Sequence, residues 1–183
     1  MRFKHFLENS SLLIESSVLS MNDLVSILNH IKHQTKTSKL LRQGDCGVFA
    51  YALANIMKTA IGILVCHNNI EELMRIENIE DSSIQISMLD GLEADFAHVF
   101  IAEEYNGKFF YFDIDGILKE SGLKSYAKTY DKPGIIFFFD HDTPRLDTLI
   151  RSNTNYTYEV AYWEQIISKT INSLKIKYLI NNT

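Results

Sequence analysis

The sequence predicts an α+β fold in which helices flank an antiparallel sheet. The chain of 183 residues is 46 % hydrophobic, which is enough to bury one core of useful size. Residues 22–33 and 46–58 have the hydrophobic pattern of helices, whereas residues 97–114 alternate around an Asn-Gly pair as the strands of a hairpin do. These three observations together favour mixed, segregated helices and strands.

No Gly/Ser linker, internal repeat or low-complexity block divides the sequence. We therefore expect a single domain over residues 1–183. Its core is predicted at roughly residues 43–139, with helical extensions at residues 1–42 and 140–183.

Four segments have helical periodicity. Residues 22–33 place Leu24 and Ile31 with their neighbours on one apolar face, and residues 46–58 are apolar almost all round, with Asp45 placed to act as an N-cap. A short helical pattern covers residues 70–76, and a long amphipathic helix is predicted over residues 156–180.

Four segments carry the predicted sheet or its apolar runs. Residues 61–66 form a short apolar run and residues 84–88 are a candidate strand. Residues 97–114 are predicted to form a hairpin, because Asn106-Gly107 suits both positive-φ positions of a type I′ turn. Residues 135–139 lack alternation, which predicts a central strand buried on both faces.

Charge and hydropathy exclude several classes of partner. With 18 Lys+Arg against 23 Asp+Glu the formal net charge is −5, so no basic surplus is available for nucleic acid or an acidic membrane surface. The longest apolar runs have the length of strands rather than of membrane spans. Glu8 and Glu15 interrupt what would be the apolar part of a secretory signal. We expect a cytoplasmic protein, or one delivered to a host cell without a recognisable signal peptide.

Cys46 is the first candidate for chemistry. It follows the polar segment Gln43-Gly44-Asp45 and begins an apolar helix, where unsatisfied N–H groups and the helix dipole favour the thiolate. The same N–H groups can bind an oxyanion, and Gln43 offers a further side-chain donor. Cys66 lies inside an apolar run and is predicted to be a small buried hydrophobe.

A histidine and two aspartates supply the groups that a cysteine nucleophile needs. If Tyr105 pairs with Lys108, extending the hairpin register places Asp115 opposite His98 and Asp113 diagonally adjacent on the same face. A carboxylate on one ring nitrogen orients the imidazole and leaves the other nitrogen for the thiol proton. The register favours Asp115, but Asp113 also comes within reach.

These residues resemble the papain-like cysteine peptidase superfamily in its broad sense. QGDCGVFAYAL (43–53) is similar to the nucleophile helix of bacteriocin-processing peptidases, and residues 98–113 resemble the hairpin of transglutaminase-like proteins. The resemblance implies a papain-like core with Cys46 as nucleophile, His98 as general base and Asp113 as orienting acid. It departs from the family at the oxyanion glutamine, since many relatives have it where this chain has Leu40.

The resemblance implies a thiol-dependent acyl-transfer enzyme, a cysteine peptidase or isopeptidase with a protein or peptide substrate. A glutamine deamidase or transglutaminase would use the same triad, and a non-catalytic interaction module with this fold is the alternative from another class. The amphipathic C-terminal helix offers a surface for an oligomer contact. No cofactor and no metal are expected, because the chain lacks a Walker loop, a Gly-x-Gly-x-x-Gly segment and zinc-ligand spacing.

Overall fold

The computed structural model describes residues 19–34, 45–174 and 176 of the chain. Within these residues the fold is α+β, as predicted. The helices are α2 (Met21–Gln34), α4 (Cys46–Met57), α5 (Ile70–Glu77), α6 (Ser82–Asp90), α7 (Glu120–Thr129), α8 (Leu146–Asn153) and α9 (Val160–Ser173). The strands are β1 (Ala60–Cys66), β2 (Asp95–Tyr105), β3 (Lys108–Asp113), β4 (Gly116–Leu118) and β5 (Gly134–Asp140).

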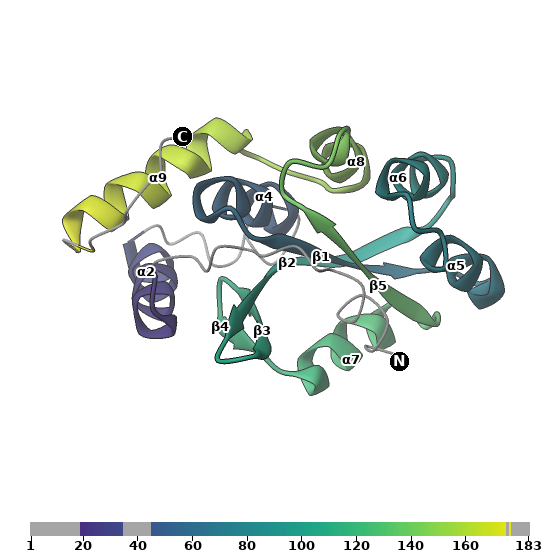
Figure 1. Cartoon of the computed structure of the whole chain (residues 1–183), viewed down its shortest axis with the longest axis horizontal. Coiled ribbons are helices and arrows are strands. Elements are labelled where there is room, and N and C mark those ends of the chain that lie inside the picture. Colours follow the sequence, from purple (N-terminus) through teal and green to yellow (C-terminus); the bar gives the residue numbers. More distant parts are fainter. Residues whose placement is uncertain (1–18, 35–44, 175, 177–183) are drawn as a thin grey trace.

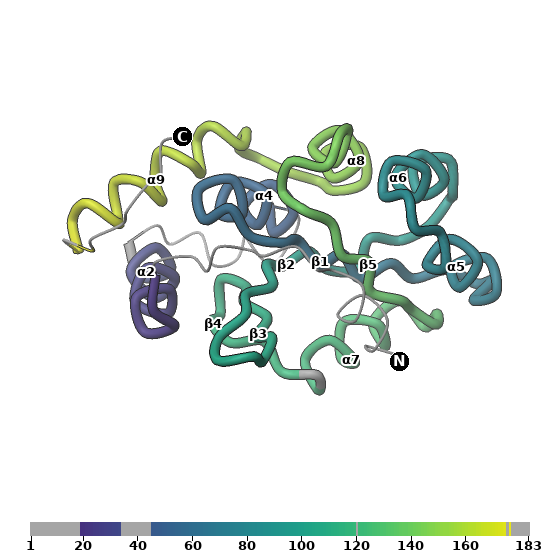
Figure 2. The backbone as a smooth tube through the Cα atoms, in the orientation of Figure 1, coloured from purple at the N-terminus to yellow at the C-terminus, as the bar shows by residue number. Residues whose placement is uncertain are grey.

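The five strands form one antiparallel sheet in the order β4-β3-β2-β1-β5. Helices α4, α8 and α9 lie on one side of this sheet and α7 lies on the other (Figure 1). Helices α5 and α6 follow β1 along the chain and sit together at one end of the molecule (Figure 2). The main core therefore lies between the sheet and α4, and a smaller apolar cluster lies under α7.

Helix α4 is buried on most sides because the sequence gives it few polar residues. It packs against β2 on one side and against α8 and α9 on the other. Phe49 of α4 meets Trp163 of α9 edge to face, with ring centroids 5.4 Å apart. The predicted all-round apolar helix is thus confirmed, since most of its residues are buried.

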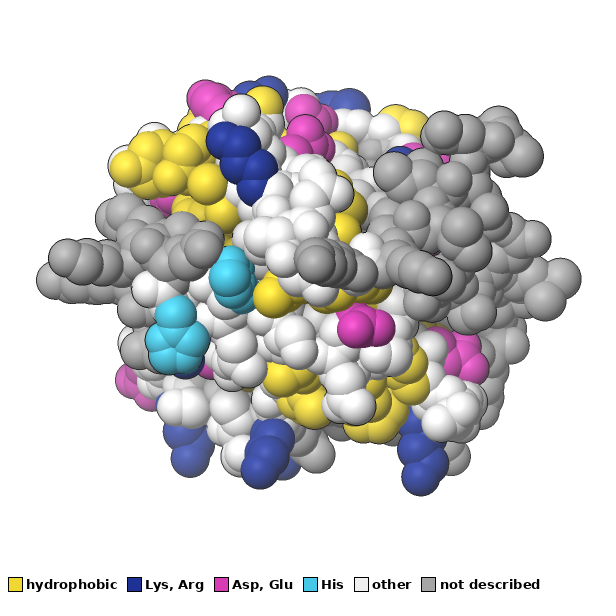
Figure 3. Space-filling view, turned by 90° about the vertical axis from the view of Figure 1, so that its left-hand side faces the viewer, with side chains coloured by type: hydrophobic (Ala, Val, Ile, Leu, Met, Phe, Trp, Pro, Cys, Tyr) yellow, Lys and Arg dark blue, Asp and Glu magenta, His cyan; other side chains and the backbone are white. Residues whose placement is uncertain are grey.

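Helix α2 begins with a reciprocal cap between Ser20 and Asp23. The Asp23 amide donates to the Ser20 hydroxyl at 3.2 Å, and the Ser20 amide donates to the Asp23 carboxylate at 3.1 Å. The predicted apolar face, which includes Leu24 and Ile31, is fully buried. Helix α2 contacts α9 and β4. Figure 3 views this end of the molecule, where charged side chains of both signs are scattered among apolar ones over the described surface.

The predicted hairpin is confirmed. Tyr105 pairs with Lys108 across the turn, and Asn106 and Gly107 have φ of 53° and 72°. Both central residues thus have the positive φ of a type I′ turn, which matches the twist of the flanking strands.

The predicted strand over residues 84–88 is wrong, because this segment belongs to α6. The Asp81 side chain accepts hydrogen bonds from the amides of Ser83 and Ile84 and thereby caps the helix. Only Ile86 and Leu89, three residues apart, are buried. A short segment with apolar residues at both two- and three-residue spacings fits either periodicity, and the cap decides for the helix.

The strand predicted over residues 135–139 exists as β5, but it is an edge strand rather than a central one. Its two faces are both covered: Phe137 and Phe139 join the main core, while Ile136 joins the cluster under α7. The lack of alternation between apolar and polar residues therefore indicates that both faces of the sheet are covered here. It gives no information on whether the strand is central or at an edge. The neighbouring strand β1 lies between β2 and β5 and is buried along its whole length.

The long helix predicted over residues 156–180 is shorter in the structure. Helix α9 begins at Val160, and residues 175 and 177–183 lie outside the described part. Trp163 and Ile167 of α9 are fully buried inside the chain, and an oligomer contact through this helix stays a prediction.

Helix α7 was not predicted, because its sequence is mostly polar. In the structure its residue Leu123 is fully buried, whereas the neighbours of Leu123 are half-buried or exposed. In the described part of the chain no helix combines the length and apolar character needed to cross a membrane.

Candidate active site

Cys46 is the first residue of α4, as the sequence predicts. Asp45 precedes it at the N-cap position, but the Asp45 side chain accepts no hydrogen bond from the first amides of α4. The predicted capping hydrogen bond is therefore wrong. The Asp45 carboxylate, only 1 % exposed, accepts a hydrogen bond from the amide of Thr157 in the segment before α9. This contact ties the start of α4 to the C-terminal part of the fold.

Gly47 permits a close approach of α8 to the start of α4. A Cβ atom at this position would lie 2.8 Å from Ile150 Cγ2 and 2.9 Å from Thr154 Cγ2. We expect Gly47→Ala to lower the free energy of unfolding by about 1–3 kcal/mol, because a methyl group must be forced into a packed contact. Urea denaturation measures this, with Gly91→Ala as the control, since a Cβ there meets nothing closer than 3.7 Å. Equal stability of the two variants would contradict the prediction.

His98 lies in β2 and is 4 % exposed. The pairing of β1 with β2 shifts between Leu64, which faces His98, and Val65, which faces Phe96. A β-bulge of this kind bends the strand and re-aims the side chains beside it. His98 is thus held at an irregular point of β2, close to the end of β3.

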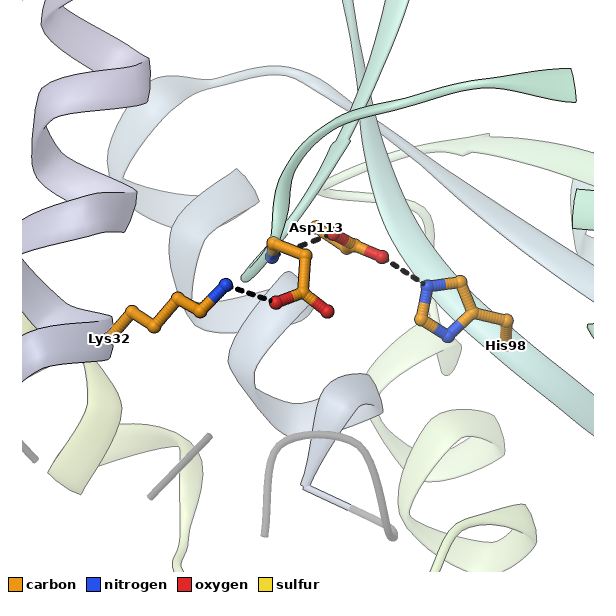
Figure 4. Close-up of polar contacts among 4 residues, drawn as sticks. Lys32, His98 and Asp113 are labelled. Carbon is orange, nitrogen blue, oxygen red and sulfur yellow. Dashed lines mark hydrogen bonds and ion pairs between the residues drawn. The ribbon is translucent and has the colours of Figure 1, made fainter. Parts of the chain in front are cut away.

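Asp113 is the last residue of β3 and is the carboxylate that binds His98. Its Oδ2 atom lies 3.0 Å from His98 Nε2, and its Oδ1 atom accepts a hydrogen bond of 2.8 Å from the backbone amide of Asp115. Figure 4 shows the imidazole turned toward this carboxylate. Asp113 is 8 % exposed, so the pair is largely shielded from water.

The register prediction that placed Asp115 opposite His98 is wrong. The ladder between β2 and β3 ends at Ile101 and Phe112. The chain then reverses, so that Asp113 pairs with Gly116 of β4. Asp115 therefore lies in a turn and not along the strand, and its carboxylate contacts Lys32 Nζ at 2.6 Å. Its support of the site runs through its backbone amide, which donates to Asp113.

The charges around His98 favour its protonated form. Burial by itself lowers the pKa of His98, but the hydrogen bonds with Asp113 and with the Cys46 side chain, and the charges of both, outweigh burial and raise this pKa to about 9. Since Asp113 occupies Nε2, the other ring nitrogen is the one left for the thiol. The structure thus brings together the three side chains that the sequence predicts.

Tyr126 of α7 is a site residue that sequence reasoning missed. Its ring stacks on the imidazole of His98 with centroids 3.9 Å apart and planes inclined by 10°. Such a stack fixes the ring plane and excludes water from one face of the imidazole. No local signal in the polar sequence of α7 marks this role.

A small pocket adjoins the three side chains. Its volume is about 10 Å³, which gives room for about one water molecule. Besides Cys46, His98 and Asp113, it is lined by Phe49, Ala50, Leu53, Val99, Ile101, Phe112, Ile114, Asp115 and Tyr126. Cys46 is half-buried, whereas Cys66 is fully buried and burial raises the pKa of its thiol to about 11. The predicted buried character of Cys66 is confirmed.

Two further expectations concern oxyanion and metal binding. Gln43, expected as an oxyanion donor, lies outside the described residues. Among residues 19–34, 45–174 and 176, no group of three or more His, Cys, Asp or Glu side chains is arranged to hold a metal ion.

A comparison of the chain with known protein families, with curated proteins and with solved structures finds no match. The chemistry of the site must therefore be inferred from its own residues.

Proposed function

We propose that the chain is a cysteine hydrolase of the papain-like type, which cleaves peptide or isopeptide bonds through a thioester on Cys46. The observation that carries this proposal is the position of His98 between the Asp113 carboxylate and the Cys46 thiol at the start of a buried helix. A buried histidine with a carboxylate on one side and a thiol on the other has the composition and order of a nucleophile, base and orienter.

The proton of the Cys46 thiol passes to His98, which gives the thiolate–imidazolium pair that the raised pKa of His98 favours. In the first half-reaction the sulfur of this thiolate attacks the substrate carbonyl carbon. The backbone N–H groups at the start of α4 lack partners within the helix and are suited to bind the developing oxyanion. The carbon–nitrogen bond then breaks, and the imidazolium of His98 donates its proton to the leaving amine. A thioester on Cys46 and a free amine result.

In the second half-reaction water attacks the thioester while His98 accepts a proton from it. The carbon–sulfur bond breaks, a carboxylic acid leaves, and the Cys46 sulfur recovers its proton from His98. Asp113 holds the ring through both steps and stabilises its cationic form. The pocket beside these residues has room for about one water molecule, which is the second reactant of this step.

The proposal predicts selective reactivity of Cys46. With iodoacetamide at pH 7 we expect Cys46 to react on the order of a hundredfold faster than Cys66, because alkylation requires an accessible thiolate. Cys66 is buried, and its raised pKa keeps it protonated. Peptide mapping by mass spectrometry measures both rates. The Cys46→Ser variant is the control and should retain only the slow reaction. Equal, slow labelling of both cysteines would support a packed, non-catalytic interaction module instead.

The reaction itself is tested with a peptide library prepared from a whole-cell digest, incubated with the chain or with Cys46→Ala. Hydrolysis of peptide bonds predicts new peptide termini that are absent with the variant. Conversion of glutamine to glutamate without new termini would identify a deamidase, and cross-linked peptides would identify a transglutaminase. Either of these two results would replace the peptidase proposal while keeping the same nucleophile.

A further inference from the structure

A continuous line of polar contacts joins helix α2 to the proposed site. Lys32 Nζ lies 2.6 Å from Asp115 Oδ1, the Asp115 amide donates to Asp113 Oδ1 at 2.8 Å, and Asp113 Oδ2 lies 3.0 Å from His98 Nε2. Figure 4 shows Lys32 reaching from its helix toward the carboxylates, and His98 on the far side of them. The charge of Lys32 is thus two residues away from the imidazole.

The Asp113 carboxylate depends on Asp115 for its second hydrogen bond. Asp115 belongs to the two-residue turn between β3 and β4, where Asp113 pairs with Gly116, and Gly116 has a φ of 104°. Such a tight turn directs the Asp115 amide back toward Asp113. A change in the conformation of this turn therefore alters the hydrogen bond that sets the rotation of the Asp113 carboxylate.

Lys32 is placed by the packing of its own helix. Its neighbour Ile31 and the preceding Leu28 are fully buried, and α2 contacts both β4 and α9. The side chains of Lys32 and Asp115 are 31 % and 33 % exposed, so their ion pair is partly shielded but still open to salt. An ion pair this exposed contributes little to global stability, and its effect is expected in local geometry.

We propose that Lys32 is a positioning residue of the proposed active site, which acts through the Asp115 turn to hold Asp113 against His98. This inference rests on the proposed function for its kinetic readout, but not for its spectroscopic one. It makes the docking of α2 a condition for full reactivity of Cys46, although α2 contributes no side chain to the triad.

The first test uses Lys32→Met, which removes the charge and keeps much of the side-chain length. We expect the rate constant for alkylation of Cys46 at pH 7 to fall about fivefold, the effect of losing a partly exposed ion pair. Asp115→Asn should give a similar loss, and the double variant should lose no more than either single one. Lys32→Arg, which keeps the charge, should restore the rate to within about twofold of that of the original chain.

The second test follows His98 directly by NMR titration of histidine labelled with carbon-13 and nitrogen-15. The titratable groups beside its ring are Cys46 from α4, Asp113 from β3 and Tyr126 from α7, and the apolar ring of Phe100 from β2 lies 6.1 Å away. If Lys32 positions Asp113, the Nε2 resonance and the midpoint of the His98 titration move in Lys32→Met and return in Lys32→Arg. A purely structural loss would change the melting temperature without this pattern of rescue.

The matched control removes another ion pair on the surface. Arg75 and Glu72 form an exposed ion pair within α5, and Arg75→Met should change neither the alkylation rate nor the His98 titration. Raising the salt concentration to about 1 M should lower the reactivity of the original chain toward that of Lys32→Met, since this reduces the Debye length to about 3 Å.

Identical titrations of His98 in Lys32→Met and the original chain would overturn the inference. Slow labelling of Cys46 in the original chain would instead overturn the proposed function, and the NMR titration would still decide the role of Lys32.

Discussion

Replacing His98 with alanine is expected to lower the alkylation rate of Cys46 about a hundredfold at pH 7, because the thiol loses its proton acceptor and the thiolate loses its cationic partner. The imidazole is the hydrogen-bonding partner of the Cys46 side chain and is almost fully buried. The measurement is the rate of iodoacetamide labelling of Cys46 relative to Cys66 in one sample, which corrects for differences in protein concentration.

His141→Ala is the matched control for this prediction. His141 is half-buried, lies in the turn after β5, and is not among the residues that line the pocket at the site. We expect its labelling ratio to equal that of the original chain. Circular dichroism must show that His98→Ala is folded at the assay temperature. A folded His98→Ala variant with the original labelling ratio would contradict the proposed role of the histidine.

The second large effect concerns stability and pH. The pKa of His98 is raised from its ordinary 6.5 to about 9, so folding favours the protonated ring. This contribution is fully present below about pH 6.5, decreases as the pH rises, and is lost once the pH passes about 9. A shift of this size corresponds to on the order of 3 kcal/mol. Urea denaturation between pH 6 and pH 10 should show the decline.

Asp113→Asn separates this effect from the general increase in negative charge at high pH. The variant loses the carboxylate that bonds His98 Nε2 but keeps a side chain of the same shape. It should be less stable than the original chain below about pH 6.5, and the two stability curves should converge above about pH 9. Parallel curves over the whole range would show that the His98–Asp113 pair does not control the pH dependence.

Features set by short stretches of sequence could be predicted. The apolar face of α2 follows from the helical spacing of its apolar residues. The hairpin follows from Asn106-Gly107, because a type I′ turn requires only two central residues with positive φ. The meeting of Cys46 with His98 could also be anticipated, because the order and spacing of Cys46, His98 and Asp113 resemble those of papain-like enzymes, and the two side chains do interact.

Features set by tertiary packing could not be predicted in the same way. The choice of Asp113 over Asp115 depends on where β3 ends, and a hairpin register carries no information on that point. The ion pair between Lys32 and Asp115 joins residues 83 positions apart. Tyr126 reaches His98 only because α7 lies on the face of the sheet opposite α8 and α9 (Figure 1). The sequence of α7 is too polar to indicate a buried contact.

The position of β5 at the edge of the sheet has a consequence for how this protein behaves when it is stressed. Its sequence, GIIFFFD, combines five consecutive apolar residues with backbone groups that face away from β1. Segments of this composition form intermolecular β-structure readily when neighbouring packing loosens. Within the described fold, residues 135–139 are therefore where we expect aggregation to begin during heating or refolding at high concentration.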